Sequence, residues 1–319
     1  MVPDAGRVDR TRTRQRTVTV LTVLAVAACY YATARLGLLQ QLVRGQVTAL
    51  WPSTGIAVAA LLMFGLRVWP GIALGALCVN ITIGPSLSYV LVIAAGNTLA
   101  PIFSVLLLRR AGFREELDRL RDALALVFLG ALAGMLISSV TGVGALVASG
   151  ALSTAEFWPT WSVWWTGDAI GVMVVTPFLL ALRRVRPPLD TGPARWAEAA
   201  VLAVATGAVT VLVTVVVGAP LLFLVFPFLV WAAFRFERGG AACCALGVSV
   251  LAVLGAGRGT GPFAHHSLLA NMITLQAFIG TAALTSLLLA AVVTERSATY
   301  REIKRLCDQL SGKVSRQEP

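Results

Sequence analysis

Long apolar runs, separated by short polar connections, constrain the fold of this chain more than any other feature of its sequence. A helix rises about 1.5 Å per residue, so about 20 apolar residues cross the roughly 30 Å of hydrocarbon in a bilayer. We predict an all-α integral membrane protein, a polytopic bundle of about ten transmembrane helices within a range of eight to ten. The predicted helices are residues 17–38, 49–65, 68–83, 88–108, 123–149, 159–182, 196–217, 220–235, 240–257 and 267–293.

The distribution of basic residues predicts how these helices are oriented. With the N-terminus inside, only Arg35, Arg44 and Arg258 among the 26 Lys and Arg residues fall outside the cytoplasmic connections. This asymmetry is a strong positive-inside signal, and because both ends are basic the number of spans is even. We therefore predict a multi-pass protein of the lipid bilayer with both termini in the cytoplasm.

Composition and motifs exclude several classes of protein. Hydrophobic residues make up 57% of the chain and charged residues 13%, which is not typical of a soluble domain. The net charge of +11 does not indicate a nucleic-acid partner, because the basic residues recur in short clusters rather than along one face. The five cysteines show no zinc spacing, and the adjacent His265 and His266 cannot by themselves close a metal site. With no phosphate-binding loop and no kinase or cyclase signature, we predict no cofactor and no enzymatic activity.

The chain divides into three predicted segments: a basic cytoplasmic segment at 1–16, a membrane domain at 17–294 and a cytoplasmic helical tail at 295–319. Within the membrane domain, the connector at 109–123 mixes acids and bases at helical spacing and predicts a short amphipathic segment at the membrane surface. Paired prolines and a glycine at 183–193 predict a non-helical linker. This linker would divide six spans from four.

The tail carries apolar residues at alternating steps of three and four, broken only by the polar Arg296. They are Val293, Tyr300, Ile303, Cys307, Leu310 and Val314. Two interpretations remain open. The spacing is typical of a coiled-coil seam, which could support a homodimer, but a segment of this length could equally be a solvated tail that frays.

Asp168, in the stretch WWTGDAIG at 164–171, is the most informative single residue. An ionised carboxylate at membrane depth costs several kcal/mol unless it is paired or faces water, so such residues usually face the bundle interior. Counting about 1.5 Å per residue from the outer end of each span, Asp168 and Asn97 both lie about 13 Å deep. Gln276 lies at a similar level. Other polar groups that we expect to converge on one outward-opening pocket are Ser53, Thr54, Asn80, Asn271 and, as cationic partners, Arg35 and Arg44.

Tryptophans surround this carboxylate in the sequence. Trp161, Trp164 and Trp165 share one helical face with Asp168, and Trp51 begins the second helix at the outer interface. The alternative is an aromatic belt at headgroup level, which needs no ligand. For Asp168 itself, a structural clamp between helices remains open beside ligand or proton binding.

Several stretches together carry a resemblance to a known family. They are LWPSTGIAVAALL (50–62), GLRVWPGIALGA (65–76), GNTLAP (96–101), WWTGDAIGVMVVTP (164–177), FPFLVWAAFRF (226–236) and GTGPF (259–263). Their order and spacing resemble the first class of bacterial membrane-associated sensor domains, the MASE family, over nearly all of residues 17–296. The positions that match the family's motif are Trp51, Pro52, Gly55, Asn97, Trp165, Gly167, Asp168 and Pro177.

The resemblance implies a polytopic input module in the bacterial plasma membrane, which usually precedes a histidine kinase, a diguanylate cyclase or another signalling output. This chain departs from that pattern because it stops at residue 319, where an output domain would start. We therefore expect a module without a fused output domain, either signalling through a separate partner or existing as a stand-alone or truncated unit.

We expect a sensory input module that binds an unknown small molecule near the outer half of the bilayer and signals to a cytoplasmic kinase or cyclase through its last helix. The alternatives are a secondary transporter or channel component that uses Asp168 for proton or solute binding, and a scaffold without a ligand. The residues that we expect to bind the ligand are Asp168, Trp165, Trp164, Asn97, Trp51, Pro52, Gly55, Gly167, Asn80 and Arg35.

Overall fold

The protein is built from helices. The computed structural model describes residues 5–38, 48–84, 86–184, 192–219, 221–264 and 268–314, and no strand occurs among them. The helices are α1 (Ala5–Leu38), α2 (Pro52–Phe64), α3 (Trp69–Ile81), α4 (Leu87–Arg110), α5 (Leu120–Ala125), α6 (Leu136–Ala148), α7 (Phe157–Arg184), α8 (Pro193–Val211), α9 (Phe226–Gly257) and α10 (Leu268–Val314). The predicted all-α class is therefore confirmed. Arg44, His265 and His266, to which the sequence drew attention, lie outside the described residues.

Seven helical stretches within the described residues are long and apolar enough to cross a membrane. They are Arg14–Leu38, Leu87–Arg110, Leu120–Ala148, Thr154–Arg184, Pro193–Val216, Leu222–Gly257 and Leu269–Gln309. Two shorter apolar helices, Pro52–Phe64 and Leu66–Ile81, accompany them. Each of the ten predicted segments is largely helical, but the number of ten membrane spans and the cytoplasmic position of both termini stay predictions.

Helix α9 contains a reversal of the chain. Glu237 has φ 50° and ψ −139°, which is not helical, and this residue separates two helical arms. Ala233 and Ala241, one from each arm, lie in one buried cluster with Ala290 of α10. The chain therefore turns back at Glu237, as the predicted helices 220–235 and 240–257 require.

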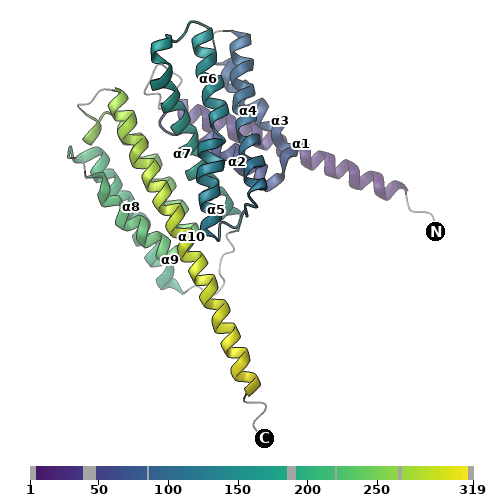
Figure 1. Ribbon diagram of the computed structural model, residues 1–319, viewed down its shortest axis with the longest axis vertical. Helices are drawn as coiled ribbons and strands as arrows, with labels where there is room; N and C mark the ends of the chain where they lie inside the picture. Colours follow the sequence, from purple (N-terminus) through teal and green to yellow (C-terminus); the bar gives the residue numbers. More distant parts are fainter. Residues whose placement is uncertain are drawn as a thin grey trace.

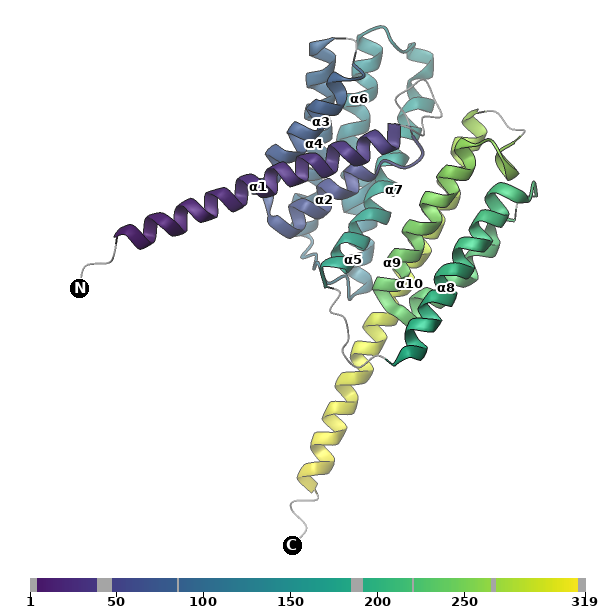
Figure 2. The same ribbon diagram turned by 180° about the vertical axis from the view of Figure 1, so that it is seen from behind.

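The helices form two groups that lie side by side, α1–α7 in one and α8–α10 in the other (Figure 1). Helix α7 connects the groups, because it packs against α2 and α6 in its own group and against α9 and α10 in the other. Helix α1 crosses α2 and α3, and its N-terminal part extends away from the bundle (Figure 2). The C-terminal part of α10 also extends beyond the other helices (Figure 1).

Two local predictions need correction. The first helix begins at Ala5, so much of the basic segment at 1–16 continues α1 as a helix. The connector at 109–123 contains no amphipathic helix between Ala111 and Arg119, because Gly112 and Leu117 adopt positive φ values of 69° and 51° and break the helical path. Such values are unfavourable in a right-handed helix. The acids and bases of this connector instead form ion pairs, which are described below.

Candidate ligand-binding site

Asp168 of α7 is enclosed by three helices. Its side chain is 3% exposed. The Thr54 hydroxyl of α2 donates to one carboxylate oxygen at 2.7 Å, and the Ser138 hydroxyl of α6 donates to the other at 2.6 Å. A carboxylate has about four lone-pair positions, so these two bonds leave acceptor capacity for a further group. The carboxylate therefore faces polar neighbours inside the bundle and not lipid.

Glycines bring α2 and α7 close enough to place Thr54 beside Asp168. A Cβ atom on Gly55 would meet the Gly171 carbonyl oxygen, and a Cβ atom on Gly171 would meet the Trp51 carbonyl oxygen. Small residues at helix contacts allow this close approach of two backbones in membranes. The Trp51 amide also donates to the Gly167 carbonyl at 3.2 Å, and the Thr176 hydroxyl donates to the Gly55 carbonyl at 3.0 Å. The contact between α2 and α7 is therefore fixed by both packing and hydrogen bonds.

A π-helical segment, Leu126–Ala133, precedes α6 and provides a different contact for Trp165. The Trp165 indole donates to the Leu132 carbonyl at 2.8 Å and stacks on Trp161, with ring centroids 5.2 Å apart. Insertions of this kind displace backbone carbonyl groups from regular helical bonding and occur often at functional sites. Trp165 thus joins α7 to the segment before α6 and does not line the cavity beside Asp168.

A cavity of about 30 Å³ lies beside the Asp168 carboxylate. The residues that line it are Thr48, Trp51, Val79, Asn80, Ile83, Tyr89, Ile93, Asn97, Trp164, Gly167 and Asp168. A cavity needs about 10–15 Å³ to hold a water molecule, so this one has room for one or two. The structure thus brings together six residues of the site that the sequence predicted: Trp51, Asn80, Asn97, Trp164, Gly167 and Asp168.

Two asparagines differ in how they are held in the cavity wall. Asn80 is buried, and its side-chain amide donates to the Ala76 carbonyl at 2.8 Å. Asn97 is half-buried, and its side-chain amide has no hydrogen-bond partner among the described residues. Asn97 therefore offers a free donor and a free acceptor across the cavity from Asp168.

Other predicted residues lie near the cavity or apart from it. Pro52 is in the first turn of α2, where it has no backbone N–H to satisfy, and Gly55 packs against α7. Gln276 of α10 donates to the Val163 carbonyl at 2.9 Å and accepts from the Thr166 hydroxyl at 2.8 Å. Asn271 donates to the Phe263 carbonyl, and Ser53 donates to the Tyr30 carbonyl. These polar groups are used for contacts between segments.

Arg35 does not pair with Asp168. Its guanidinium group donates to the Thr82 hydroxyl at 3.3 Å at an exposed position. Over the described ranges, with their gaps, Asp168 forms no ion pair, and no cluster of three His, Cys, Asp or Glu side chains could hold a metal ion. The carboxylate is held by hydroxyl groups and not by a described cation.

Sequence reasoning missed Ser138 and the apolar wall of the cavity. Ser138 is one of two adjacent serines in an apolar run, and that interruption was the one signal available. Only the π-helical segment and the turn at Gly134 and Met135 decide which of the two serines faces Asp168. Val79, Ile83 and Ile93 gave no signal, because apolar residues in a membrane helix are expected everywhere.

Fold and site together define a polytopic membrane protein in which the Asp168 carboxylate is sheltered beside a small cavity. Residues 21–297 match the model of the MASE1 family, so the chain belongs to this family of membrane-associated sensor domains. No curated protein and no solved structure matches the chain. The family match and the seven long apolar helices identify a multi-pass protein of the plasma membrane. Sensor domains of this family are not catalytic, and they are associated with signalling proteins such as kinases and cyclases.

Proposed function

We propose that the chain is a sensory input module in which a small polar ligand enters from the outer side and binds beside Asp168. Residues 17–294 form the membrane domain in this proposal, ten helices cross the bilayer and both termini are cytoplasmic. Ligand binding changes the arrangement of α10, whose extension at 295–319 signals to a histidine kinase or a diguanylate cyclase. The observation that carries the proposal is the buried Asp168 carboxylate, which retains acceptor capacity in a cavity with Asn97.

The chemistry of the cavity favours a ligand that donates hydrogen bonds. Asp168 can accept further bonds, the Asn97 amide can donate and accept, and the Trp164 indole lines the cavity with its N–H beside the Asp168 carboxylate. An intramembrane acid that faces a cavity is more typical of function than of packing. Because the cavity has a volume of about 30 Å³, a ligand larger than a few atoms requires the helices that line it to move apart.

A continuous path of contacts runs from this cavity to the tail. Gln276 attaches α10 to α7 through Val163 and Thr166, which lie within one and a half turns of Asp168. From there α10 continues without a break to Val314. The Glu295 carboxylate also accepts from the backbone amide of Leu120 at 2.9 Å. A ligand can shift α10 only if it binds its two arrangements with different affinity.

The tail supports the proposed contact with a partner or with a second copy of the chain. Tyr300, Ile303 and Leu306 are 69%, 54% and 54% exposed, and Cys307 is also exposed. On a single helix, apolar side chains at this spacing form an apolar stripe that stays exposed to water. Packing against a partner helix would bury that stripe. We propose that they pair either with a signalling partner or, in a homodimer, with the same helix of a second protomer.

Because the ligand is unidentified, the test changes Asp168 itself and measures amide hydrogen exchange in the tail. We expect Asp168→Asn to insert and fold normally but to change amide hydrogen exchange over residues 295–309 in lipid nanodiscs. The matched control is Ser139→Ala, because the Ser139 hydroxyl bonds only to backbone carbonyl groups of its own helix region. Equal exchange in the wild-type chain and in Asp168→Asn would show that the cavity does not control the tail.

A further inference from the structure

A second and larger cavity, of about 200 Å³, lies between the two groups of helices. Met173, Val174 and Leu180 of α7 form one side of it, and Ala283 and Leu287 of α10 form another. The turn at Glu237 and Arg238 and the connector between α4 and α5 surround its mouth. This cavity shares no residue with the one beside Asp168, and the inference drawn from it does not depend on the proposed function.

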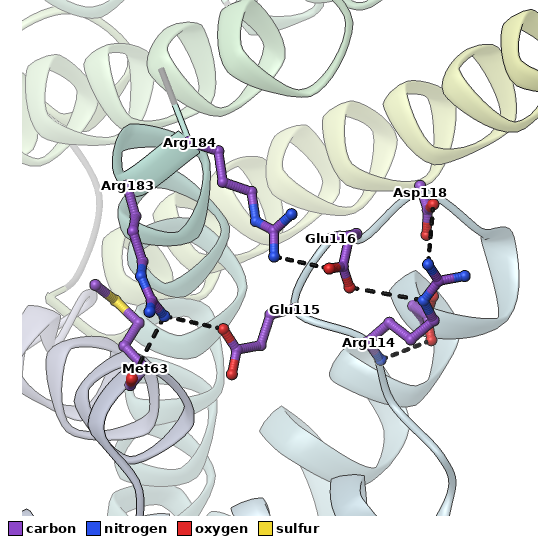
Figure 3. A network of polar contacts seen from close by, with 8 residues as sticks. Met63, Arg114, Glu115, Glu116, Asp118, Arg183 and Arg184 are labelled. Carbon is purple, nitrogen blue, oxygen red and sulfur yellow. Dashed lines mark hydrogen bonds and ion pairs between the residues drawn. The ribbon is translucent and has the colours of Figure 1, made fainter. Parts of the chain in front are cut away.

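Most charges at the mouth already have partners. Glu115 pairs with Arg183 at 3.1 Å, and Glu116 pairs with Arg184 at 2.8 Å (Figure 3). Arg114 extends this network to Glu116 and Asp118 (Figure 3). The network holds the connector against the end of α7 and neutralises two of the three acids that line the mouth.

Glu237 and Arg238 are the exception. Both are half-buried at the mouth, and neither forms a hydrogen bond or an ion pair through its side chain with any described residue. They are adjacent in the sequence and carry opposite charges. A free guanidinium group favours a phosphate or a carboxylate, and a free carboxylate beside it favours an amine. The pair therefore complements a head group that contains both a phosphate and an ammonium group.

The interior of the cavity is apolar apart from one hydroxyl group. Ser286 of α10 lines the cavity, its side chain is 2% exposed, and its hydroxyl oxygen has no partner among the described residues. A buried polar atom without a partner is uncommon and points to a missing group. An apolar cavity of about 150 Å³ is enough to bind benzene, so about 200 Å³ accommodates part of an aliphatic chain.

The dimensions of the cavity match one leaflet of a bilayer. Arg184 lies at its charged mouth and Met173 at its apolar end, and both are on α7. At about 1.5 Å per residue, they are about 16 Å apart along the helix. Half of the hydrocarbon thickness is about 15 Å. A cavity with a charged end and an apolar end at this separation fits a membrane lipid better than it fits a soluble metabolite.

We propose that this cavity is a lipid site for a zwitterionic phospholipid with a primary amine, of the phosphatidylethanolamine type. Its phosphate binds Arg238, its ammonium group binds Glu237, and its acyl chain lies between α7 and α10, where the ester carbonyl accepts a hydrogen bond from the Ser286 hydroxyl. The lipid comes from the leaflet on the side of the connector 111–119. A lipid in this position supports the contact through which α7 and α10 join the two groups.

The experiment measures lipid binding to the full chain in detergent by native mass spectrometry. Phosphatidylethanolamine, phosphatidylglycerol and phosphatidylcholine are titrated separately. We expect one phosphatidylethanolamine to bind about tenfold more tightly than the other two, since only this lipid offers a phosphate and an N–H donor together. Arg238→Gln lowers that affinity about tenfold, and Ser286→Leu, which fills the cavity, abolishes binding.

Matched variants separate these effects from misfolding. Arg235→Gln makes the same change three residues away, where the arginine pairs with Glu198 outside the cavity. Thr281→Leu makes a similar change at an exposed position of α10. Both controls should bind the lipid like the wild-type chain. Equal affinity for the three head groups, or affinity that both Arg238→Gln and Ser286→Leu leave unchanged, would overturn the proposal.

Discussion

The carboxylate of Asp168 and the carboxylates of Glu115 and Glu116 are stabilised in opposite ways. Asp168 is buried, accepts bonds from two hydroxyl groups and has no ion pair among the described residues. Glu115 and Glu116 are about one-third exposed and pair with Arg183 and Arg184. The comparison teaches that this fold uses ion pairs to attach its connector, whereas hydroxyl groups and no described cation hold the carboxylate inside the bundle. A carboxylate held in that way can still bind a ligand.

The largest effect should come from the packing that creates the inner carboxylate's environment. A Cβ atom on Gly171 would meet the carbonyl group of Trp51, so Gly171→Ala must separate α2 from α7. We expect it to lower the free energy of unfolding by about 3 kcal/mol or more, at the upper end for overpacked cores. The measurement is denaturant unfolding in detergent. Gly144→Ala is the control, because nothing lies within 4 Å of its added Cβ atom and it should be neutral or stabilising.

A second effect tests the hydroxyl groups themselves. Ser138→Ala removes the donor to one Asp168 oxygen and leaves a buried acceptor unsatisfied. We expect a loss of about 1–3 kcal/mol in the free energy of unfolding. Ser139→Ala changes the neighbouring residue, which bonds only to backbone carbonyl groups, and should cost less. Equal losses in the two variants would mean that the bond to Asp168 has no special role.

A Trp165 variant tests the contact between α7 and the π-helical segment before α6. Trp165→Phe keeps an aromatic ring but removes the indole N–H that donates to the Leu132 carbonyl. We expect the free energy of unfolding, measured by denaturant unfolding in detergent, to fall by about 1 kcal/mol. This is the typical contribution of a neutral hydrogen bond. Trp158→Phe serves as the comparison, since Trp158 is 69% exposed and donates no described hydrogen bond. A loss no larger than that of Trp158→Phe would count against this contact.

We expect the smallest loss of stability from a substitution in the connector between α4 and α5, because solvent screens its ion pairs. A hydrogen bond from its own backbone amide, followed by the bond and charge of Arg184, holds the pKa of Glu116 below its ordinary value. Its stabilisation is therefore complete above the ordinary pKa of a glutamate and is lost as the pH falls through the lowered pKa of the folded state. Glu116→Gln should cost less than about 1 kcal/mol and reduce the loss of stability that occurs as the pH falls below the ordinary pKa of a glutamate. Glu302→Gln, which removes a carboxylate from the exposed tail, is the comparison variant.

The sequence predicted the class of fold and the burial of its central carboxylate for clear physical reasons. Apolar runs of sufficient length become membrane helices, and an acid within such a run must face the interior. Side-chain partners were harder to predict, because they depend on how helices rotate about their axes. Arg35 was expected near Asp168 but bonds to Thr82, and Ser138 was not expected there at all. Charge pattern alone also failed for the connector, where backbone conformations at Gly112 and Leu117 end the helix.

The most direct test asks whether Asp168 presents its charge to a molecule that enters the cavity. Asn97→Cys, in a chain without the five native cysteines, is treated separately with a cationic and an anionic methanethiosulfonate reagent of similar size. We expect the cationic reagent to react about tenfold faster, a larger preference than at Cys307 in a separate control chain that keeps only this exposed cysteine, and Asp168→Asn to remove that preference. If the ratio of the two rates is the same with Asp168 and with Asn at that position, the carboxylate is only a clamp between helices and the proposed recognition site is wrong.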